Sequence, residues 1–121
     1  MAKRIIREDK KKPTRSYSKA QETNVAKKLN GKCTPNSGAT KFSKGDVLTE
    51  KFTLECKTKM SESNSITLHK DWLTKNEKEC LFMGKLYSAL VFNFGPNQKN
   101  YYVIDEYLFQ DLVDYLNSKE N

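Results

Sequence analysis

The sequence lacks any apolar run long enough to cross a membrane. A membrane-spanning helix needs about 20 mostly apolar residues, whereas apolar residues make up 36% of this chain and charged residues 31%. The basic residues near the N-terminus are not followed by the apolar segment that a secretory signal requires. We therefore expect no membrane partner.

Cysteine and histidine are scarce, and their spacing argues against several classes of site. The three cysteines are odd in number, lie far apart and form no C-x-x-C pair, which is typical of reduced thiols in a cytoplasmic protein. Together with the single histidine, His69, they match no zinc motif. The sequence also lacks a nucleophile elbow around any serine or cysteine and a glycine-rich phosphate loop, which disfavours a serine or cysteine hydrolase and a Walker or dinucleotide site.

The 121 residues suffice for one domain with a modest core. Their net charge of +7 is unevenly distributed, because residues 1–19 carry +6 and the remainder only +1. We predict a basic N-terminal arm over residues 1–15 and a folded domain over residues 16–121. Such an arm can bind nucleic acid or another polyanion, or it can be a solvated tail. Its basic residues are Lys3, Arg4, Arg7, Lys10, Lys11, Lys12 and Arg15.

A first helix is predicted after Pro13, with Ser16 or Ser18 as its cap and Gly31 as its end. Its spacing places four residues on one face: Glu22, Val25, Ala26 and Leu29. A carboxylate on a core-facing stripe is costly unless it has a partner. Glu22 is therefore either at the edge of the stripe, reaching water, or part of a shared acidic site.

Residues 46–57 are predicted to form a hairpin. Residues 51–57 alternate polar and apolar side chains, which is typical of a half-buried strand. Side chains two positions apart share a strand face, so we expect Thr53, Glu55 and Lys57 on the open face. The residues expected to point into the core are Phe52, Leu54 and Cys56. A short preceding strand and a tight turn at residues 50–51 would bring Asp46 beside Glu55.

The rest of the chain is predicted to add a helix over residues 70–83, a strand over 86–94, a strand over 101–104 and a last helix capped by Asp105. The apolar residues of that last helix are expected to be core: Leu108, Phe109, Leu112, Val113 and Leu116. This order of elements predicts an α/β fold in which a small mixed β-sheet is flanked by helices.

Asp46 and Glu55 would repel each other unless they share a proton or a cation. Two carboxylates about 4 Å apart repel by roughly 4 kcal/mol at an effective dielectric near 20. Mg²⁺ prefers hard oxygen ligands and keeps several waters, so two or three carboxylates suffice to hold it, with the backbone carbonyl of Cys56 and the carboxylate of Glu22 as further ligands. It would neutralise a phosphodiester and promote deprotonation of a water. Lys57 could then orient that water or stabilise charge on the phosphate.

This set of residues resembles the PD-(D/E)xK nuclease superfamily, and within it the small Holliday junction resolvases of archaea and phages. The matching residues are Glu22, the loop Asn36-Ser37-Gly38-Ala39, the segment Gly45-Asp46-Val47 and the segment Leu54-Glu55-Cys56-Lys57. The resemblance covers about residues 18–59, and the later elements continue in a compatible order. One departure is that Gly45, rather than a proline, precedes Asp46.

The resemblance implies a restriction-endonuclease-like core in which Asp46 and Glu55 bind the metal, Lys57 is the catalytic lysine and Glu22 is a supporting acid. It implies Mg²⁺ as the cofactor, with Mn²⁺ as a substitute. It also implies a homodimer, because two symmetric nicks in a four-way junction need two active sites. Ser37 corresponds to a loop serine near the scissile phosphate, and an ordinary loop serine would look the same.

The sequence therefore predicts a magnesium-dependent endonuclease that resolves branched DNA, of phage or bacterial origin and acting in the cytoplasm, which is the host's if a phage encodes it. Lys59 and Lys75 are further candidate DNA contacts, although Lys75 also fits a solvated helix lysine. One alternative is another structure-selective nuclease acting on branched or duplex DNA, such as a flap or nicking repair enzyme. The other is a non-catalytic DNA-binding module whose acids form surface salt bridges.

Overall fold

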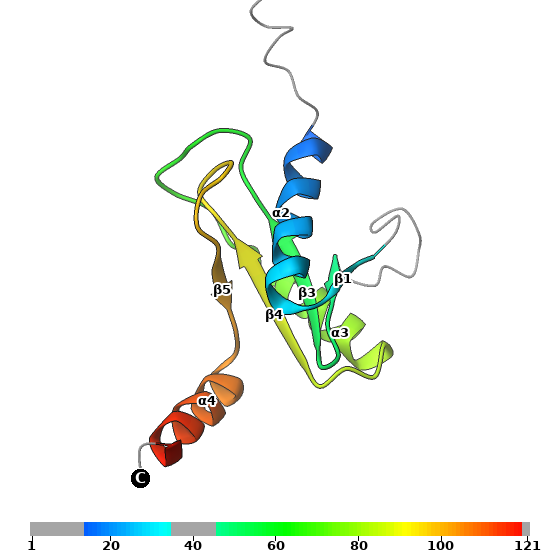
Figure 1. The fold of residues 1–121 in the computed structure, drawn as a ribbon, viewed down its shortest axis with the longest axis vertical. Helices are drawn as coiled ribbons and strands as arrows, with labels where there is room; N and C mark the ends of the chain where they lie inside the picture. The colour runs from blue at the N-terminus through cyan, green and yellow to red at the C-terminus, as the bar shows by residue number, and fades with distance from the viewer. Residues whose placement is uncertain (1–13, 35–45, 120–121) are drawn as a thin grey trace, which may run out of the picture.

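The computed structural model describes residues 14–34 and 46–119 (Figure 1). These residues form three helices and one open, five-stranded mixed β-sheet, in agreement with the predicted α/β class. None of the helices among them is long and apolar enough to span a membrane. The helices are α2 (Thr14–Leu29), α3 (Lys70–Phe82) and α4 (Glu106–Lys119). The strands are β1 (Lys32–Cys33), β2 (Val47–Leu48), β3 (Phe52–Lys57), β4 (Tyr87–Phe92) and β5 (Tyr101–Val103).

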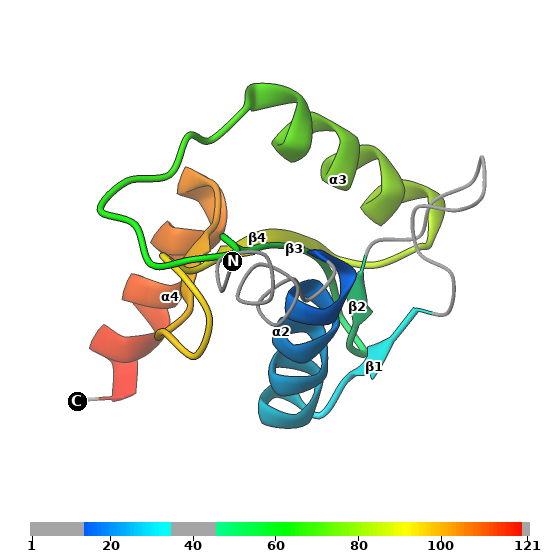
Figure 2. The ribbon, with the colours of Figure 1, turned by 90° about the horizontal axis from the view of Figure 1, so that it is seen from above.

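The sheet has the strand order β1-β2-β3-β4-β5. β3 and β4 run parallel, and the other three neighbouring pairs are antiparallel. A parallel pair requires a crossover connection, and α3 lies in the connection between these two strands. Figure 2 shows α2 on one face of the sheet and α3 on the other. The central strands are therefore covered on both sides.

The apolar core lies between α2 and the sheet. Val25 and Ala26 of α2 pack against alternate residues of three neighbouring strands. The strand members of this cluster are Val47, Leu54, Cys56, Ala89 and Val91. Burying one such aliphatic side chain contributes about 1.5–3 kcal/mol. This cluster thus holds α2 against the sheet and fixes the position of β3.

The face of β3 beneath α3 differs from the prediction of a half-buried strand. Thr53, expected on the open face, is fully buried. Asn76 of α3 is also buried, and its Nδ2 donates to the backbone oxygens of Thr53 at 3.2 Å and Ala89 at 3.0 Å. The prediction was wrong because a helix that connects parallel strands covers the second face as well.

The C-terminus of α2 is capped by a different residue from the one predicted. Asn30, rather than Gly31, adopts the left-handed conformation with φ of 58°. The Gly31 N–H donates to the Ala26 oxygen at 2.8 Å, which is the hydrogen bond of a Schellman cap. Gly31 is required for another reason, because a Cβ there would lie 2.7 Å from the carbonyl oxygen of Leu48 in β2. At the other end, α2 begins at Thr14 and so overlaps the predicted arm.

The apolar residues of α4 are not part of the core that the described residues form. The prediction for this helix is therefore wrong in that part of the chain. The helix starts as predicted, with the Leu108 N–H donating to Asp105 Oδ1 at 2.9 Å. None of its residues is buried among the described ones, and Figure 1 shows α4 extending away from the sheet beyond β5. Its exposed apolar residues are Tyr107, Phe109, Leu112, Val113, Tyr115 and Leu116. Leu29 of α2 and Leu81 of α3 are exposed as well.

We expect Asn76→Ala to destabilise the fold by about 2 kcal/mol, because two hydrogen bonds between α3 and the sheet are lost and a gap forms. The free energy of unfolding can be measured by urea denaturation. Glu77→Ala, at the exposed neighbouring position, is the matched control and should change stability little. Equal midpoints for the two variants would contradict the role assigned to Asn76.

Candidate active site at the end of β3

Asp46 lies where the β2–β3 hairpin opens. Its backbone N–H donates to the Leu54 oxygen, and its Oδ2 accepts a hydrogen bond from the Cys56 N–H, both at 2.8 Å. The register of the hairpin places Val47 opposite Leu54, so Asp46 comes next to Glu55. The backbone and the side chain of Asp46 are therefore both fixed to β3, and its carboxylate takes the place of a strand carbonyl.

Glu55 and Lys57 lie on the face of β3 that α3 covers. Lys57 Nζ is 3.5 Å from Glu55 Oε2, and the Glu55 side chain is 14% exposed. Lys57 Nζ also lies 4.4 Å from the centroid of the Trp72 ring of α3, within the range of a cation–π interaction. The lysine is thus held between an acid on its own strand and an aromatic ring on the covering helix.

The pKa of Glu55 is raised from 4.5 to about 7, mainly because the carboxylate is buried and next because the charge of Asp46 lies nearby. The charges of Lys57 and Lys75 lower this pKa, and that of Glu79 raises it. The two carboxylates predicted to repel each other do so in the structure. At neutral pH, part of the population keeps a proton on Glu55 unless a cation replaces it.

The helix α3 contributes residues that the sequence did not single out. Glu79 is buried, its Oε2 lies 3.9 Å from Lys75 Nζ, and its Oε1 has no hydrogen-bond partner among the described residues. Because its charge acts on Glu55, it belongs to the same electrostatic cluster, as does Trp72 through Lys57. The available signal was the spacing of Asn76 and Glu79, which puts two polar residues on the buried side of a helix with an imperfect apolar stripe.

Glu22 comes from the helix on the other face of the sheet. It lies on α2, whereas the side chain of Lys57 contacts α3 on the opposite face of the sheet. Its charge acts on the Cys56 thiol, whose pKa is raised first by burial, then by Asp46 and then by Glu22. Within residues 14–34 and 46–119, no three histidine, cysteine, aspartate or glutamate side chains are grouped so that they could hold one metal ion. Among these residues, Asp46, Glu55 and Glu22 therefore do not form one three-carboxylate group.

The carboxylates of Asp46 and Glu55 nevertheless fit a hard divalent cation. Mg²⁺ is often bound through one or two carboxylates and keeps several of its waters. The pKa of Glu55 is raised first by burial and then by the charge of Asp46, and a cation between the two carboxylates would favour the charged form of Glu55. The backbone carbonyl of Cys56, next in the strand, stays a candidate third ligand.

The predicted DNA contacts are only partly described. Ser37 and the arm residues Lys3, Arg4, Arg7, Lys10, Lys11 and Lys12 lie outside the described residues. Arg15 lies in α2, but its side chain is not described. Lys59 follows β3 and is half-buried, and Lys75 is exposed on α3 near Glu79. His69 precedes α3 as its exposed N-cap residue.

Comparisons with models of known protein families, with curated proteins and with solved structures find no match to this chain. The resemblance to junction resolvases therefore rests on the sequence motif alone.

We expect Glu55→Gln to remove a loss of stability that occurs as the pH rises. The folded protein holds the Glu55 proton more tightly than the unfolded chain, because the pKa is about 7 rather than 4.5. Wild-type protein should therefore lose up to about 3 kcal/mol between pH 4.5 and pH 7. In urea denaturation with EDTA present, the free energy of unfolding of Glu55→Gln should exceed that of wild type at pH 8. At pH 4.5 the two free energies should differ little.

Glu50→Gln, in the exposed turn of the hairpin, is the control for this measurement. The difference in free energy of unfolding between Glu50→Gln and wild type should not change between pH 4.5 and pH 8. A constant difference between Glu55→Gln and wild type from pH 4.5 to pH 8 would contradict the burial and repulsion described for Glu55.

Proposed function

We propose that the protein is a magnesium-dependent endonuclease that cleaves branched DNA, most specifically a Holliday junction resolvase. The observation that carries this proposal is the fixed group at the end of β3. Asp46 is held by the Cys56 N–H, Glu55 lies beside it with its side chain 14% exposed, and Lys57 is 3.5 Å from Glu55. This group combines two carboxylates that can hold a metal and one lysine ammonium on a short hairpin. Metal-assisted hydrolysis of a phosphodiester uses such groups.

Asp46 and Glu55 would hold the metal. When bound, Mg²⁺ supplies neutralisation of the phosphate charge and a lowered pKa of a water. The protein's own residues do the rest. Asp46, fixed through its backbone N–H and its side chain, would fix the position of the cation. Glu55, which holds a proton in part of the population at neutral pH, would release it on binding the cation.

Lys57 would act on the phosphate or the attacking water. The Lys57 side chain is 31% exposed, and its Nζ lies between Glu55 and Trp72. A lysine held in this way loses little additional side-chain freedom when substrate arrives. It can therefore stabilise the charge that develops on a phosphate oxygen without first being reoriented. Trp72 is a positioning residue in this scheme, because it acts through Lys57.

We further propose that the protein acts as a homodimer that packs through α4. This 14-residue helix exposes a row of large apolar side chains, among them Phe109, Leu112 and Leu116. Isolated helices of this length are marginal in water, and exposed apolar patches of this kind mark interaction sites. A two-fold interface pairs the same surface of both copies, so an amphipathic helix can cover its counterpart. Two active sites would then be available for the two strands of a junction.

Purified protein is expected to cleave a synthetic four-way DNA junction in the presence of Mg²⁺, and EDTA should abolish the reaction. Asp46→Asn should reduce the cleavage rate by about 100-fold or more, because one of the two candidate ligands is lost. Gel analysis of labelled junction strands measures this. Asp71→Asn, an exposed acid at the start of α3, is the control and should cleave at the wild-type rate.

Different outcomes separate the alternatives. Faster cleavage of flaps or nicked duplexes than of junctions would favour another structure-selective nuclease. Binding of DNA without any magnesium-dependent cleavage would overturn the nuclease proposal in favour of a binding module. Undiminished cleavage by Asp46→Asn would remove Asp46 from the site.

The dimer can be tested by light scattering after size-exclusion chromatography. Wild-type protein should have twice the mass of one chain, and Leu112→Glu should shift the population to the monomer, because it places a charge in the apolar interface. Gln110→Glu introduces the same group at an exposed position of the same helix and should leave the dimer intact. A monomeric wild-type protein at tens of micromolar would exclude this interface.

A further inference from the structure

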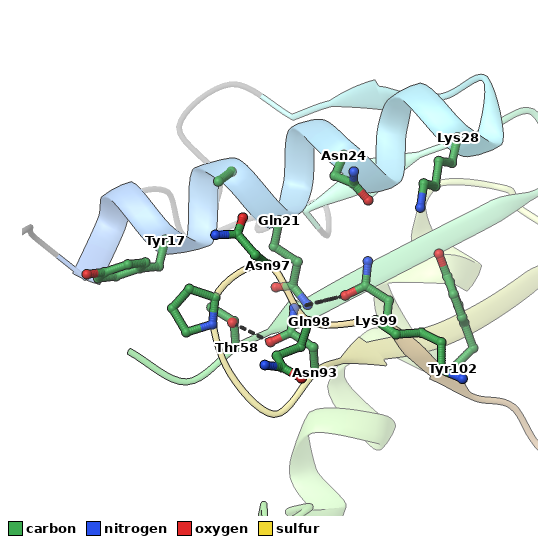
Figure 3. Close-up of a pocket in the computed structure, with 13 residues that line it drawn as sticks. Tyr17, Gln21, Asn24, Lys28, Thr58, Asn93, Asn97, Gln98, Lys99 and Tyr102 are labelled. Carbon is green, nitrogen blue, oxygen red and sulfur yellow. Dashed lines mark hydrogen bonds between the residues drawn. The ribbon is translucent and has the colours of Figure 1, made fainter. Parts of the chain in front are cut away.

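A polar cleft of about 590 Å³ lies between α2 and the loop that connects β4 to β5. It lies on the α2 side of the sheet, away from the side chain of Lys57. Figure 3 shows residues of α2 on one wall, with the side chain of Gln21 projecting from the helix, and residues of the β4–β5 loop on the other wall. Its volume falls within the range of small-molecule and cofactor sites.

The chemistry of the lining is unusual for this chain. Six of the lining residues carry neutral amides: Gln21, Asn24, Asn93, Asn97, Gln98 and Asn100. Two tyrosines, Tyr17 and Tyr102, and two lysines, Lys28 and Lys99, also line it. Among the described residues in this lining there is no aspartate or glutamate. The cleft thus offers paired donors and acceptors, aromatic rings and positive charge, but no negative charge.

Hydrogen bonds hold the amides of the cleft in place. Asn93 Oδ1 accepts from the Thr58 hydroxyl at 2.6 Å, and Asn93 Nδ2 donates to Asn100 Oδ1 at 3.0 Å. Gln21 Nε2 donates to the backbone oxygen of Lys57 at 2.8 Å and to Asn100 Oδ1 at 3.3 Å. Because both partners of Nε2 are acceptors, the orientation of the Gln21 amide is determined.

Gln21 leaves one strong acceptor unused. Gln21 is 5% exposed as a residue, and its Oε1 has no hydrogen-bond partner among the described residues. An unpaired buried acceptor costs about 1–3 kcal/mol, so such a group in a native protein calls for a partner. Gln21 lines the cleft. A ligand with an N–H donor would supply the missing hydrogen bond.

We infer that this cleft binds a nucleotide with its base unstacked, and that the DNA substrate supplies it. The inference rests on the proposed nuclease function for the source of the nucleotide. Gln21 Oε1 accepts from an N–H on the base edge, one of the two tyrosines that lie at opposite ends of the cleft contacts the base, and Lys28 and Lys99 lie at the phosphates. The link to the active site is direct, because Gln21 bonds the carbonyl of Lys57 and Thr58 is the next residue. Branched DNA offers unpaired bases at low cost, since unstacking is cheapest where pairing is already broken.

The test uses a single-stranded oligonucleotide that contains 2-aminopurine, in EDTA, so that no cleavage is needed. The double variant Asn24→Leu/Lys28→Ala changes two cleft residues on α2. The matched control Thr23→Leu/Lys27→Ala changes the adjacent exposed residues of the same helix, which do not line the cleft. We expect binding of the cleft variant to be about tenfold weaker than that of the control. We also expect a change in the 2-aminopurine emission on wild-type binding that the cleft variant loses.

Equal affinities and equal emission changes for the two double variants would overturn the inference. If junctions are still cleaved in that case, the nuclease proposal stands and the cleft assignment fails. If binding depends on the cleft but no junction is cleaved with Mg²⁺, the cleft assignment stands and the nuclease proposal fails. A second experiment titrates free dAMP. If the cleft variant loses dAMP binding but binds the oligonucleotide as tightly as the control, a DNA strand is refuted as the source of the nucleotide.

Discussion

The hydrogen bond from the Cys56 N–H to the Asp46 carboxylate determines where the candidate site lies. β2 comprises only two residues, and a longer strand would place a backbone carbonyl at this position of β3. Because a carboxylate occupies it instead, pairing between the strands ends and an ionised group is held at the point of separation. A hydrogen bond to a charged acceptor is stronger than one between neutral groups. The same contact therefore ends the sheet locally and fixes one of the two acids.

Burial then gives the second acid its properties. A carboxylate on an exposed strand face would have an ordinary pKa and would be an unremarkable surface acid. Glu55 instead lies beneath α3, close to the charges of Asp46 and Glu79, with Lys57 and Lys75 partly compensating. The cover exists because β3 and β4 are parallel and the chain must cross over the sheet between them. The topology of the sheet thus supplies the environment that makes this acid a candidate ligand.

How much the sequence could predict depends on whether a feature is local. The hairpin, its turn and the contact of Asp46 with β3 were predictable, because they follow from strand alternation and a separation of about ten residues. The roles of Gln21, Trp72 and Glu79 were not, since they depend on how α2 and α3 are rotated about their axes when they pack. The stripe on α2 predicted Leu29 as core, yet Leu29 is exposed and Gln21 is buried. The amphipathic pattern of α4 predicted an apolar face correctly but could not show that the described part of the chain leaves it uncovered.

Lys57 links the two polar regions of the molecule. Side chains of a strand alternate between its faces, whereas its carbonyls lie in the plane of the sheet. The Nζ of Lys57 therefore belongs to the α3 side with Glu55 and Trp72, while its backbone oxygen accepts a hydrogen bond from Gln21 on the α2 side. A DNA strand that crosses the end of β3 could place a phosphate against the first group and an adjacent base against the second. The amide network would then position the backbone of Lys57, the residue proposed to act in catalysis. Base binding and phosphate cleavage would both depend on the position of this residue.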